Sequence, residues 1–442
     1  MQDWLTQSAS DLGRGIARGE IDPVALTATY LDAIESHPHR DRIYARVTED
    51  RAMSEAKAAK ARAETGRRLS LLDGVPISWK DLFDSAGTTT GAGSLLLKDR
   101  VPQRDAPVLA RATAAGLVCL GKTHMSELAF SGLGYNPQTA TPPCVNDDAA
   151  VPGGSSSGAA ASVAFGLAAA GIGSDTGGSV RIPSAWNDLV GLKTTSGRLT
   201  LDGVVPLCLK FDTIGPLTRS VEDAAQLLAV MEGRTSPDLT GASLEGRRIA
   251  RLRTVAEDDL RDGPGAAYEA ALDRMAEAGA EIVDVTHPDL EDAMALSGIL
   301  YTTEAYGLWK DVIEADPGKM FGEILERFRL GKQFSGPDYV AAWAKLDALR
   351  KDWTRAMAGF DAVATPSAAI LPPNLDRLIN DGDYYVTENL LALRNTRIGN
   401  LMGSCGLSLP TGTPSCGLQL LGASMAEDRL VRLGAAAEAA LA

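Results

Sequence analysis

The stretch PGGSSSGAAASVAFGLAAAGIGSDTGGSVRIP, residues 152–183, organises the rest of the chain. It holds two glycine–serine clusters, residues 153–158 and 173–179, joined by the uncharged run 159–172. That run is too short to span a bilayer and too rich in small apolar residues to lie on a surface. Glycine lets another group approach the backbone closely, and serine carries the smallest hydroxyl nucleophile. The stretch therefore predicts a buried segment flanked by two loops that form opposite walls of an active site.

The composition of the 442-residue chain is typical of a soluble globular protein, with 45% hydrophobic and 23% charged residues. Asp and Glu together number 57 and Lys and Arg 43, which gives a net charge of −14. Nucleic acids and anionic membranes are bound mainly through positive charge. We therefore expect neither a nucleic-acid nor a membrane partner.

The cysteines and histidines argue against disulfides and against a zinc site. The five cysteines include no Cys-x-x-Cys pair, and the four histidines show no His-Glu-x-x-His spacing. The N-terminal residues lack the basic start and apolar core of a signal peptide. We therefore expect reduced thiols, no metal and a cytoplasmic location.

Periodicity and capping signals predict an alternation of helices and strands. A helical segment opens the chain, and a short apolar run then ends at Lys80. After Ser179 we expect strand and turn as far as Leu217. The remaining expected elements are a helix at 220–231, a linker at 233–246, a strand–helix–strand unit at 248–285, helices at 296–358, a strand at 360–372 and a final helix at 428–442.

Ser179 and Lys80 are candidate catalytic residues on local grounds. The run Thr176-Gly177-Gly178 before Ser179 would let successive backbone N–H groups point at one spot, which suits an oxyanion. Lys80 ends an apolar run, and burial there would lower its pKa and make it a base. Taken alone, the glycines are equally compatible with a plain turn before a strand, and the local sequence around Lys80 favours an exposed lysine at a strand end.

A competing motif is present in the first cluster. Residues 154–158 match G-x-S-x-G, the nucleophile elbow of α/β-hydrolases, with Ser156 as the nucleophile. That fold needs a histidine further along the chain, and His287 is the one that follows. An esterase that uses Ser156 and His287 is therefore an alternative hypothesis.

Three motifs in fixed order carry a family resemblance: GVPISWKD at 74–81, PGGSSSG at 152–158 and GSDTGGSVRIPSA at 173–185. Together they resemble the amidase signature family, most specifically over residues 70–220. The resemblance implies an α/β fold: one large domain in which a mixed sheet is flanked by helices. Within that domain we expect N-terminal helices at 1–65, the signature core at 70–220, a variable substrate-shaping part at 247–385 and a return to the core at 386–442.

The resemblance also implies a role for each matching residue. Ser179 corresponds to the acyl-enzyme nucleophile, Ser155 to a bridging serine that relatives hold with a cis peptide bond, and Lys80 to the base. On this reading Ser156 supports the site by hydrogen bonding and is not a nucleophile. The resemblance further assigns the oxyanion donors to Thr176, Gly177, Gly178 and Ser179, the pocket wall to Ala129 and Ser131, and a supporting role to Asp175 and Arg181.

The chain departs from the family pattern behind the nucleophile. Ser157 stands where glycine is common, Trp186-Asn187-Asp188 replaces Phe-Cys-Gly, and Thr194-Thr195 replaces Pro-Thr. None of these changes falls on Lys80 or on the two catalytic serines. We therefore expect an active enzyme.

The predicted function is hydrolysis of a carboxamide in a small molecule, with release of ammonia or an amine and without a metal or organic cofactor. The alternative within the family is a glutaminase-type subunit of an amidotransferase that feeds ammonia to glutamyl-tRNA. The sequence leaves open whether the substrate is an aliphatic, aryl, ureido or acidic amide. It also leaves open a homodimer.

Overall fold

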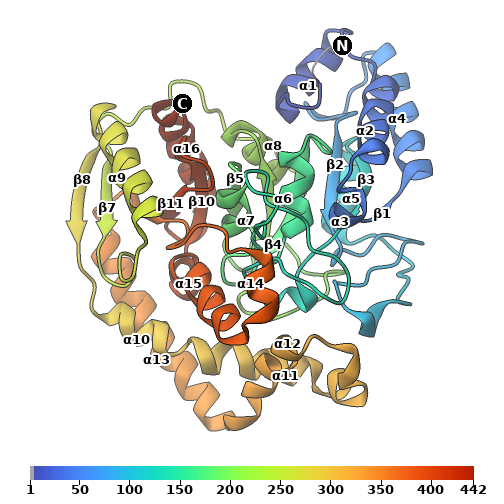
Figure 1. Ribbon diagram of the computed structural model, residues 1–442. Helices are drawn as coiled ribbons and strands as arrows, with labels where there is room; N and C mark the ends of the chain where they lie inside the picture. The colour runs from blue at the N-terminus through green and yellow to red at the C-terminus, as the bar shows by residue number, and fades with distance from the viewer. Residues whose placement is uncertain (1–3) are drawn as a thin grey trace.

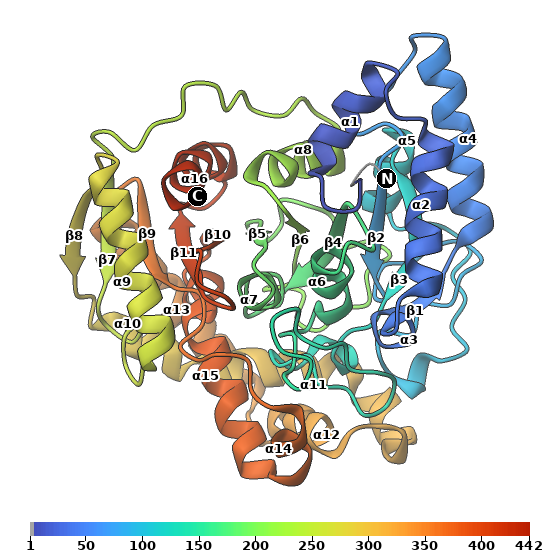
Figure 2. The same cartoon turned by 45° about the horizontal axis from the view of Figure 1, so that its top comes forward.

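The computed structural model describes residues 4–442. Within them, one mixed sheet of eleven strands runs through the molecule and is flanked by helices (Figures 1 and 2). In sheet order the strands are β1 (Tyr44–Val47), β3 (Val118–Thr123), β2 (Pro76–Lys80), β4 (Ala170–Asp175), β6 (Thr213–Thr218), β5 (Val190–Lys193), β10 (Cys405–Pro410), β11 (Gly417–Gly422), β9 (Ala362–Pro366), β7 (Arg248–Leu252) and β8 (Glu281–Val285). The expected fold class is confirmed.

The α-helices flank this sheet, and those at 375–401 were not predicted from the sequence. They are α1 (Ala9–Ala17), α2 (Pro23–Ser36), α3 (Arg40–Ile43), α4 (Glu49–Glu64), α5 (Pro107–Ala114), α6 (Ser157–Ala164), α7 (Arg181–Trp186), α8 (Val221–Glu232), α9 (Asp262–Glu277), α10 (Asp289–Ala295), α11 (Ser297–Ala315), α12 (Gly322–Arg329), α13 (Gly336–Met357), α14 (Leu375–Asn380), α15 (Gly382–Leu401) and α16 (Glu427–Leu441). Short 3₁₀ turns lie at Leu95–Leu97, Glu127–Ala129, Pro317–Lys319 and Leu330–Gln333. Of the helices in residues 4–442, none combines the length and apolar character needed to cross a lipid bilayer.

Helices α1, α2 and α8 each begin directly after a polar residue that caps the first turn. The side chains of Ser8, Asp22 and Ser220 each accept a hydrogen bond from a backbone N–H in the first turn of α1, α2 and α8. Such bonds satisfy N–H groups that have no partner within the helix. The expected helical segment 1–65 is confirmed in large part, except that residues 1–3 lie outside the described residues.

Parallel pairing in the sheet brings Lys80 to the second glycine–serine cluster, residues 173–179. β2 lies between β3 and β4 and is parallel to both, with Trp79 opposite Ile172. The carboxyl ends of parallel strands meet at one edge of a sheet. Lys80 at the end of β2 therefore lies beside Ser174 and Asp175 at the end of β4.

Three parts of the predicted secondary structure are wrong. The segment after Ser179 forms helix α7 where strand and turn were expected, and β1 lies inside the expected helical segment as an antiparallel partner of β3. The predicted strand at 360–372 is limited to Ala362–Pro366. These elements are short, and contacts with other parts of the chain stabilise them more than local propensity does.

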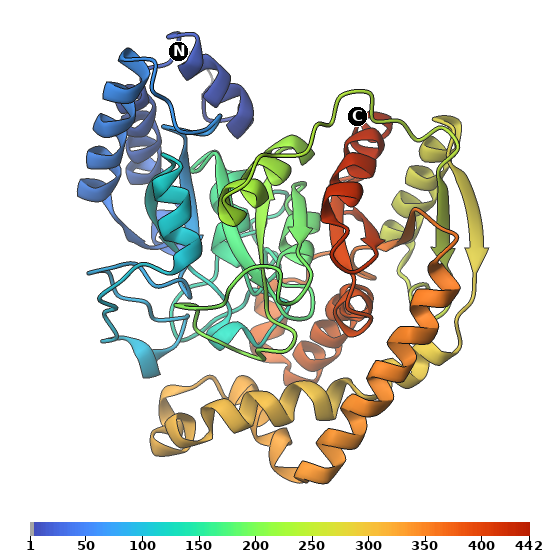
Figure 3. The same cartoon turned by 180° about the vertical axis from the view of Figure 1, so that it is seen from behind.

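The chain passes over the molecule between residues 233 and 246, where the sequence predicts a linker (Figure 2). Beyond it, β7, α9 and β8 form the expected strand–helix–strand unit at the far edge of the sheet. Helices α10 to α13 then form a layer across the lower side of the molecule in Figures 1 and 3. Together with α15, this layer approaches the signature core, and the cavity described below lies between them.

Candidate active site

Lys80 is fully buried at the end of β2. Its Nζ donates a hydrogen bond to Ser155 Oγ at 2.7 Å and another to Ser174 Oγ at 2.9 Å. Burial lowers the pKa of Lys80 to about 7, and the charges of Asp175 and Asp212 offset only part of that effect. A large fraction of this lysine is therefore neutral at neutral pH and can accept a proton.

Ser155 follows a cis peptide bond between Gly154 and Ser155, as the family resemblance implies. The backbone around it is tightly packed: the Gly154 N–H donates to Gly132 O at 2.8 Å. A Cβ on Gly154 would lie 2.6 Å from Gly134 N, so a side chain cannot be accommodated there. The fixed loop holds the Ser155 hydroxyl against Lys80.

Ser179 lines a cavity, together with Thr176 and Gly177. Its carbonyl accepts a hydrogen bond from Ser156 N at 3.2 Å, which ties the two glycine–serine loops to each other. Within residues 4–442, the Ser179 hydroxyl makes no hydrogen bond with the protein. The hydroxyl is therefore available to a molecule in the cavity.

The expected set of oxyanion donors needs one correction. The Gly178 N–H donates to Asp175 Oδ1 at 2.9 Å and is already used. In the described chain, the N–H groups of Thr176, Gly177 and Ser179 have no protein acceptor. The backbone instead requires a glycine at position 178, because its φ is +142° and a Cβ there would lie 2.1 Å from Thr396 Oγ1.

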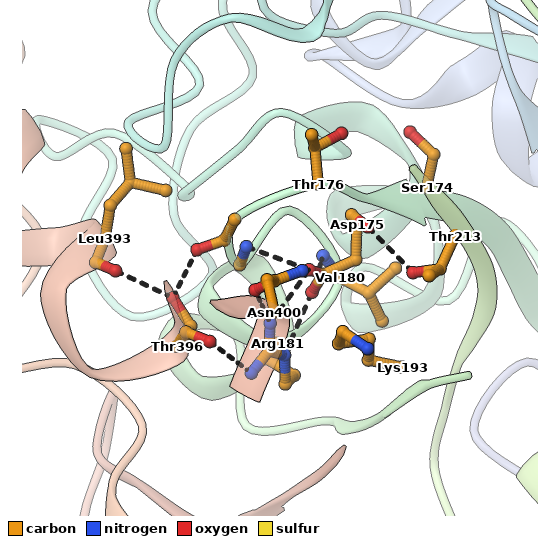
Figure 4. A network of polar contacts seen from close by, with 12 residues as sticks. Ser174, Asp175, Thr176, Val180, Arg181, Lys193, Thr213, Leu393, Thr396 and Asn400 are labelled. Atoms are coloured by element: carbon orange, nitrogen blue, oxygen red, sulfur yellow. Dashed lines mark hydrogen bonds and ion pairs between the residues drawn. The ribbon is translucent and has the colours of Figure 1, made fainter. Parts of the chain in front are cut away.

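A buried ion pair shapes the loop that carries Ser179. Both carboxylate oxygens of Asp175 accept bonds from the Arg181 guanidinium, at 3.0 and 2.8 Å. Arg181 also donates to the Thr396 carbonyl and to Asn400 Oδ1, as Figure 4 shows. Burial alone would raise the pKa of Asp175, but the ion pair outweighs this effect and holds the pKa well below its usual range. The supporting residues expected from the sequence thus anchor the loop to α15.

Replacing Arg181 with methionine is expected to destabilise the protein by about 3–5 kcal/mol, because it leaves a buried carboxylate unpaired. Urea unfolding at pH 7 measures the loss. The double variant with Asp175→Asn, which also removes the charge, should recover part of it. A loss below about 1 kcal/mol, the size of a surface ion pair, would contradict the buried-pair assignment.

Asp212 is a supporting residue that sequence reasoning missed. Thr176 Oγ1 donates to Asp212 Oδ1 at 2.5 Å, and the N–H groups of Leu207 and Cys208 donate to the other oxygen. Burial raises the pKa of this carboxyl, although these hydrogen bonds oppose the shift. Asp212 lies directly before β6, which pairs with β4, and only this strand pairing brings it to Thr176.

The esterase hypothesis is wrong on geometric grounds. Ser156 Oγ donates to the Ser174 carbonyl at 3.2 Å, is buried against β4 and is not among the residues that line the cavity. His287 follows β8, seven strand spacings from β4, which corresponds to a separation on the order of 30 Å. His287 packs edge-on against Trp353 and is not among the residues that line the cavity.

The cavity in front of Ser179 has a volume of about 150 Å³. Ala129 and Ser131 lie in its wall as expected, and Ser131 Oγ accepts a bond from Tyr385 OH at 2.9 Å. The other lining residues come from the loop that carries Ser179, from the chain at residues 130, 207 and 330, and from α11, α12 and α15: Phe130, Thr176, Gly177, Ser179, Leu207, Ser297, Gly298, Tyr301, Thr302, Arg327, Leu330, Leu390, Leu393 and Arg397. The residues from α11 and α12 belong to the substrate-shaping part expected at 247–385, whereas the sequence did not single out residues 390, 393 and 397, whose spacing marks one face of α15.

Comparison with known proteins identifies the family. A family model described as Amidase matches residues 25–431, nearly the whole chain. The chain belongs to the amidase family. Its members hydrolyse amide bonds, and this amidase is a hydrolase of that class. Among its described residues, no group of three or more His, Cys, Asp or Glu side chains could hold a metal ion.

Relatives of this amidase are similar along their full length. It is 35% identical over 438 residues to 2-amino-5-chloromuconic acid deaminase of Comamonas testosteroni, covering 96% of this chain and 94% of that protein. It is 33% identical over 476 residues to a glutamyl-tRNA(Gln) amidotransferase subunit from Anaeromyxobacter dehalogenans, covering 97% and 95%. The native peptide amidase of Stenotrophomonas maltophilia has the same fold, with a TM-score of 0.83, 27% identity and coverage of 98% and 96%.

The departures of this amidase from the family pattern support the site. The Asn187 side-chain amide donates to the carbonyls of Pro152 and Pro183, at 2.7 and 2.8 Å. These prolines are the two ends of the organising stretch 152–183. The Trp186 ring N–H donates to Ile370 O at 3.2 Å. The unusual residues therefore tie the two glycine–serine loops to each other and to the chain after β9.

Proposed function

We propose that this amidase hydrolyses a carboxamide in a small molecule through an acyl-enzyme on Ser179. The observation that carries the proposal is the pair formed by the buried Lys80 and Ser155, with Nζ and Oγ 2.7 Å apart, next to the loop of Ser179. A lysine whose pKa lies near 7 can act as a base at neutral pH. Similarity to a peptide amidase and to a muconic acid deaminase supports hydrolysis of a bond between carbon and nitrogen.

In the proposed reaction, Ser179 Oγ attacks the amide carbon and its proton passes to Ser155 Oγ, whose own proton passes to Lys80 Nζ. The free N–H groups of Thr176, Gly177 and Ser179 stabilise the negative oxygen of the tetrahedral intermediate. The protonated lysine then returns the proton through Ser155 to the leaving nitrogen, and ammonia or an amine departs. Water attacks the resulting ester by the same relay and releases the carboxylic acid.

A screen of small carboxamides for ammonia or amine release tests the proposal directly. Added hydroxylamine should divert part of the product to a hydroxamate, because it competes with water for the acyl-enzyme. Turnover without any hydroxamate at high hydroxylamine would contradict a covalent intermediate.

The pH dependence follows from the lowered pKa of Lys80. Because the base acts only when neutral, kcat/KM should rise about tenfold per pH unit below pH 7 and level off above it. The measurement is kcat/KM from pH 5 to pH 9 with an amide that does not titrate in this range. A profile that falls between pH 6 and pH 9 would point to a different base.

A glutaminase-type subunit of an amidotransferase is the second candidate, favoured by the 33% identity to a glutamyl-tRNA(Gln) amidotransferase subunit. A glutaminase assay and co-purification with companion subunits separate this candidate from an amidase that acts alone. We also propose a cytoplasmic location, which agrees with five free, buried cysteines. A homodimer stays a prediction for light scattering to test.

A further inference from the structure

We propose that the cavity in front of Ser179 binds a carboxylate, and that the substrate is a small amide bearing a free carboxylate held by Arg327 and Arg397. This inference rests on the proposed amide hydrolysis and narrows its substrate class. Three observations support it: two arginines line the cavity, neither forms an ion pair within residues 4–442, and most of the other lining side chains are apolar.

Among the described residues that line the cavity, two are cationic and none is anionic. Arg327 comes from α12 and Arg397 from α15, and the lining residues include no Asp or Glu. Within residues 4–442, neither guanidinium forms an ion pair. The chain nevertheless has 57 acidic residues against 43 basic ones, so carboxylates are abundant elsewhere. Two positive charges without an ion-pair partner in the described residues therefore lie in the wall of one cavity.

Each guanidinium is held by aromatic contacts that leave its donors largely free. Arg327 donates one hydrogen bond, to the Phe130 carbonyl at 2.9 Å, and lies 4.5 Å from the centre of the Phe130 ring. Arg397 lies 6.0 Å from the centre of the Tyr301 ring and makes no hydrogen bond with the described protein residues. An arginine has five N–H donors in a planar fork that matches a carboxylate.

The two arginines line the same cavity and carry charges of the same sign. Burial lowers the pKa of Arg327 to about 10, and the charge of Arg397 contributes to the same shift. Burial also lowers the pKa of Arg397. Unpaired, partly desolvated charges of one sign cost free energy, which an anion placed between them would offset. The fully buried Arg181, by contrast, has an anionic partner in Asp175.

The rest of the wall favours a carbon skeleton over a highly charged anion. Leu207, Leu330, Leu390 and Leu393 line the cavity with the rings of Phe130 and Tyr301. Such a surface binds apolar groups, and the free N–H groups of Thr176, Gly177 and Ser179 lie in the loop that carries Ser179. The substrate that fits this cavity therefore has its amide at Ser179, its carboxylate at Arg327 and Arg397, and a short apolar chain between the two groups.

Matched substrate pairs test the inference. Succinic and glutaric monoamides are compared with butyramide and valeramide, in which a methyl group replaces the carboxylate. We expect kcat/KM to be at least about 100-fold higher for the acid amides, as bidentate charge-assisted pairing provides. Equal kcat/KM values within threefold would overturn the inference.

Variants of the two arginines test whether these residues cause the preference for acid over neutral amides. Arg397→Met and Arg327→Met should each reduce the preference for acid over neutral amides about tenfold or more. Arg397→Lys keeps the charge and should lose less than Arg397→Met. Arg355→Met, at an exposed arginine on α13 that pairs with Asp352, is the matched control and should leave the preference unchanged. An unchanged preference in both Met variants with normal melting temperatures would overturn the assignment.

A binding measurement separates this inference from the proposed function. Calorimetric titration of the Ser179→Ala variant with glutaric monoamide needs no turnover, so it reports on the arginines even if no amide is hydrolysed. We expect Kd to rise at least about tenfold when Arg397→Met is added. Tighter binding of 3-phosphonopropionamide than of succinic monoamide would overturn the carboxylate assignment in favour of a phosphate-like anion.

Discussion

The Ser179→Ala variant is expected to lose amide hydrolysis by about 10⁴-fold or more, since no other hydroxyl replaces the nucleophile. Its melting temperature should stay within about 2 °C of the wild type, because the Ser179 hydroxyl makes no hydrogen bond in the described structure. Ammonia release under saturating substrate measures the first quantity and thermal unfolding the second. Loss of activity without loss of stability is the signature of a reacting group.

His287→Gln is the informative control for the Ser179 variant. His287 lies at the far edge of the sheet, so the substitution should leave hydrolysis unchanged within about threefold, as expected for a residue remote from the site. An inactive His287 variant that is folded, together with an active Ser179 variant, would overturn the assignment of the nucleophile.

The Lys80→Met variant is expected to lose about 10³-fold or more in kcat, the size of a general-base contribution together with misplacement of Ser155. Methionine keeps most of the side-chain volume and removes the buried charge. Lys80→Arg should also be inactive, because a guanidinium does not release its proton near neutral pH. The measurement is kcat at pH 8, where the wild-type lysine is mostly neutral.

Lys193 offers a matched control for Lys80. It is also fully buried, and burial lowers its pKa to about 8. Its Nζ donates to the carbonyls of Thr194 and Ser404, away from the cavity. Lys193→Met should therefore lower stability by about 1–3 kcal/mol through unsatisfied carbonyls and leave kcat largely intact. Equal losses of kcat in both variants of folded protein would contradict a specific role for Lys80.

The elements predicted correctly are those with a local signal. Caps at Ser8, Asp22 and Ser220 satisfy the first N–H groups of their helices wherever those helices pack. The short helix α7 and the edge strand β1 lack such signals. Arg181 in α7 pairs with Asp175 and β1 pairs with β3, so contacts with distant segments stabilise both elements.

The oxyanion donors illustrate a feature that the sequence motif does not predict. The order of Thr176, Gly177, Gly178 and Ser179 predicts a run of N–H groups, but not which of them are free. The Asp175 carboxylate takes the Gly178 N–H because the ion pair with Arg181 holds that carboxylate over the loop. Which backbone N–H groups remain free for an oxyanion thus depends on the position of the Asp175 side chain, which tertiary packing fixes.

The sequence by itself determined the α/β fold class, the amidase resemblance and the positions proposed to act as nucleophile, relay and base. It could do so because Lys80, Ser155 and Ser179 lie in motifs whose neighbours also dictate the local backbone. Only the tertiary structure decided what the cavity can bind. Arg327 and Arg397 look like ordinary surface arginines of two helices, and their meaning arises when α11, α12 and α15 enclose them without a carboxylate. Charge pairing depends on distance in space, which the spacing of residues along a chain does not encode.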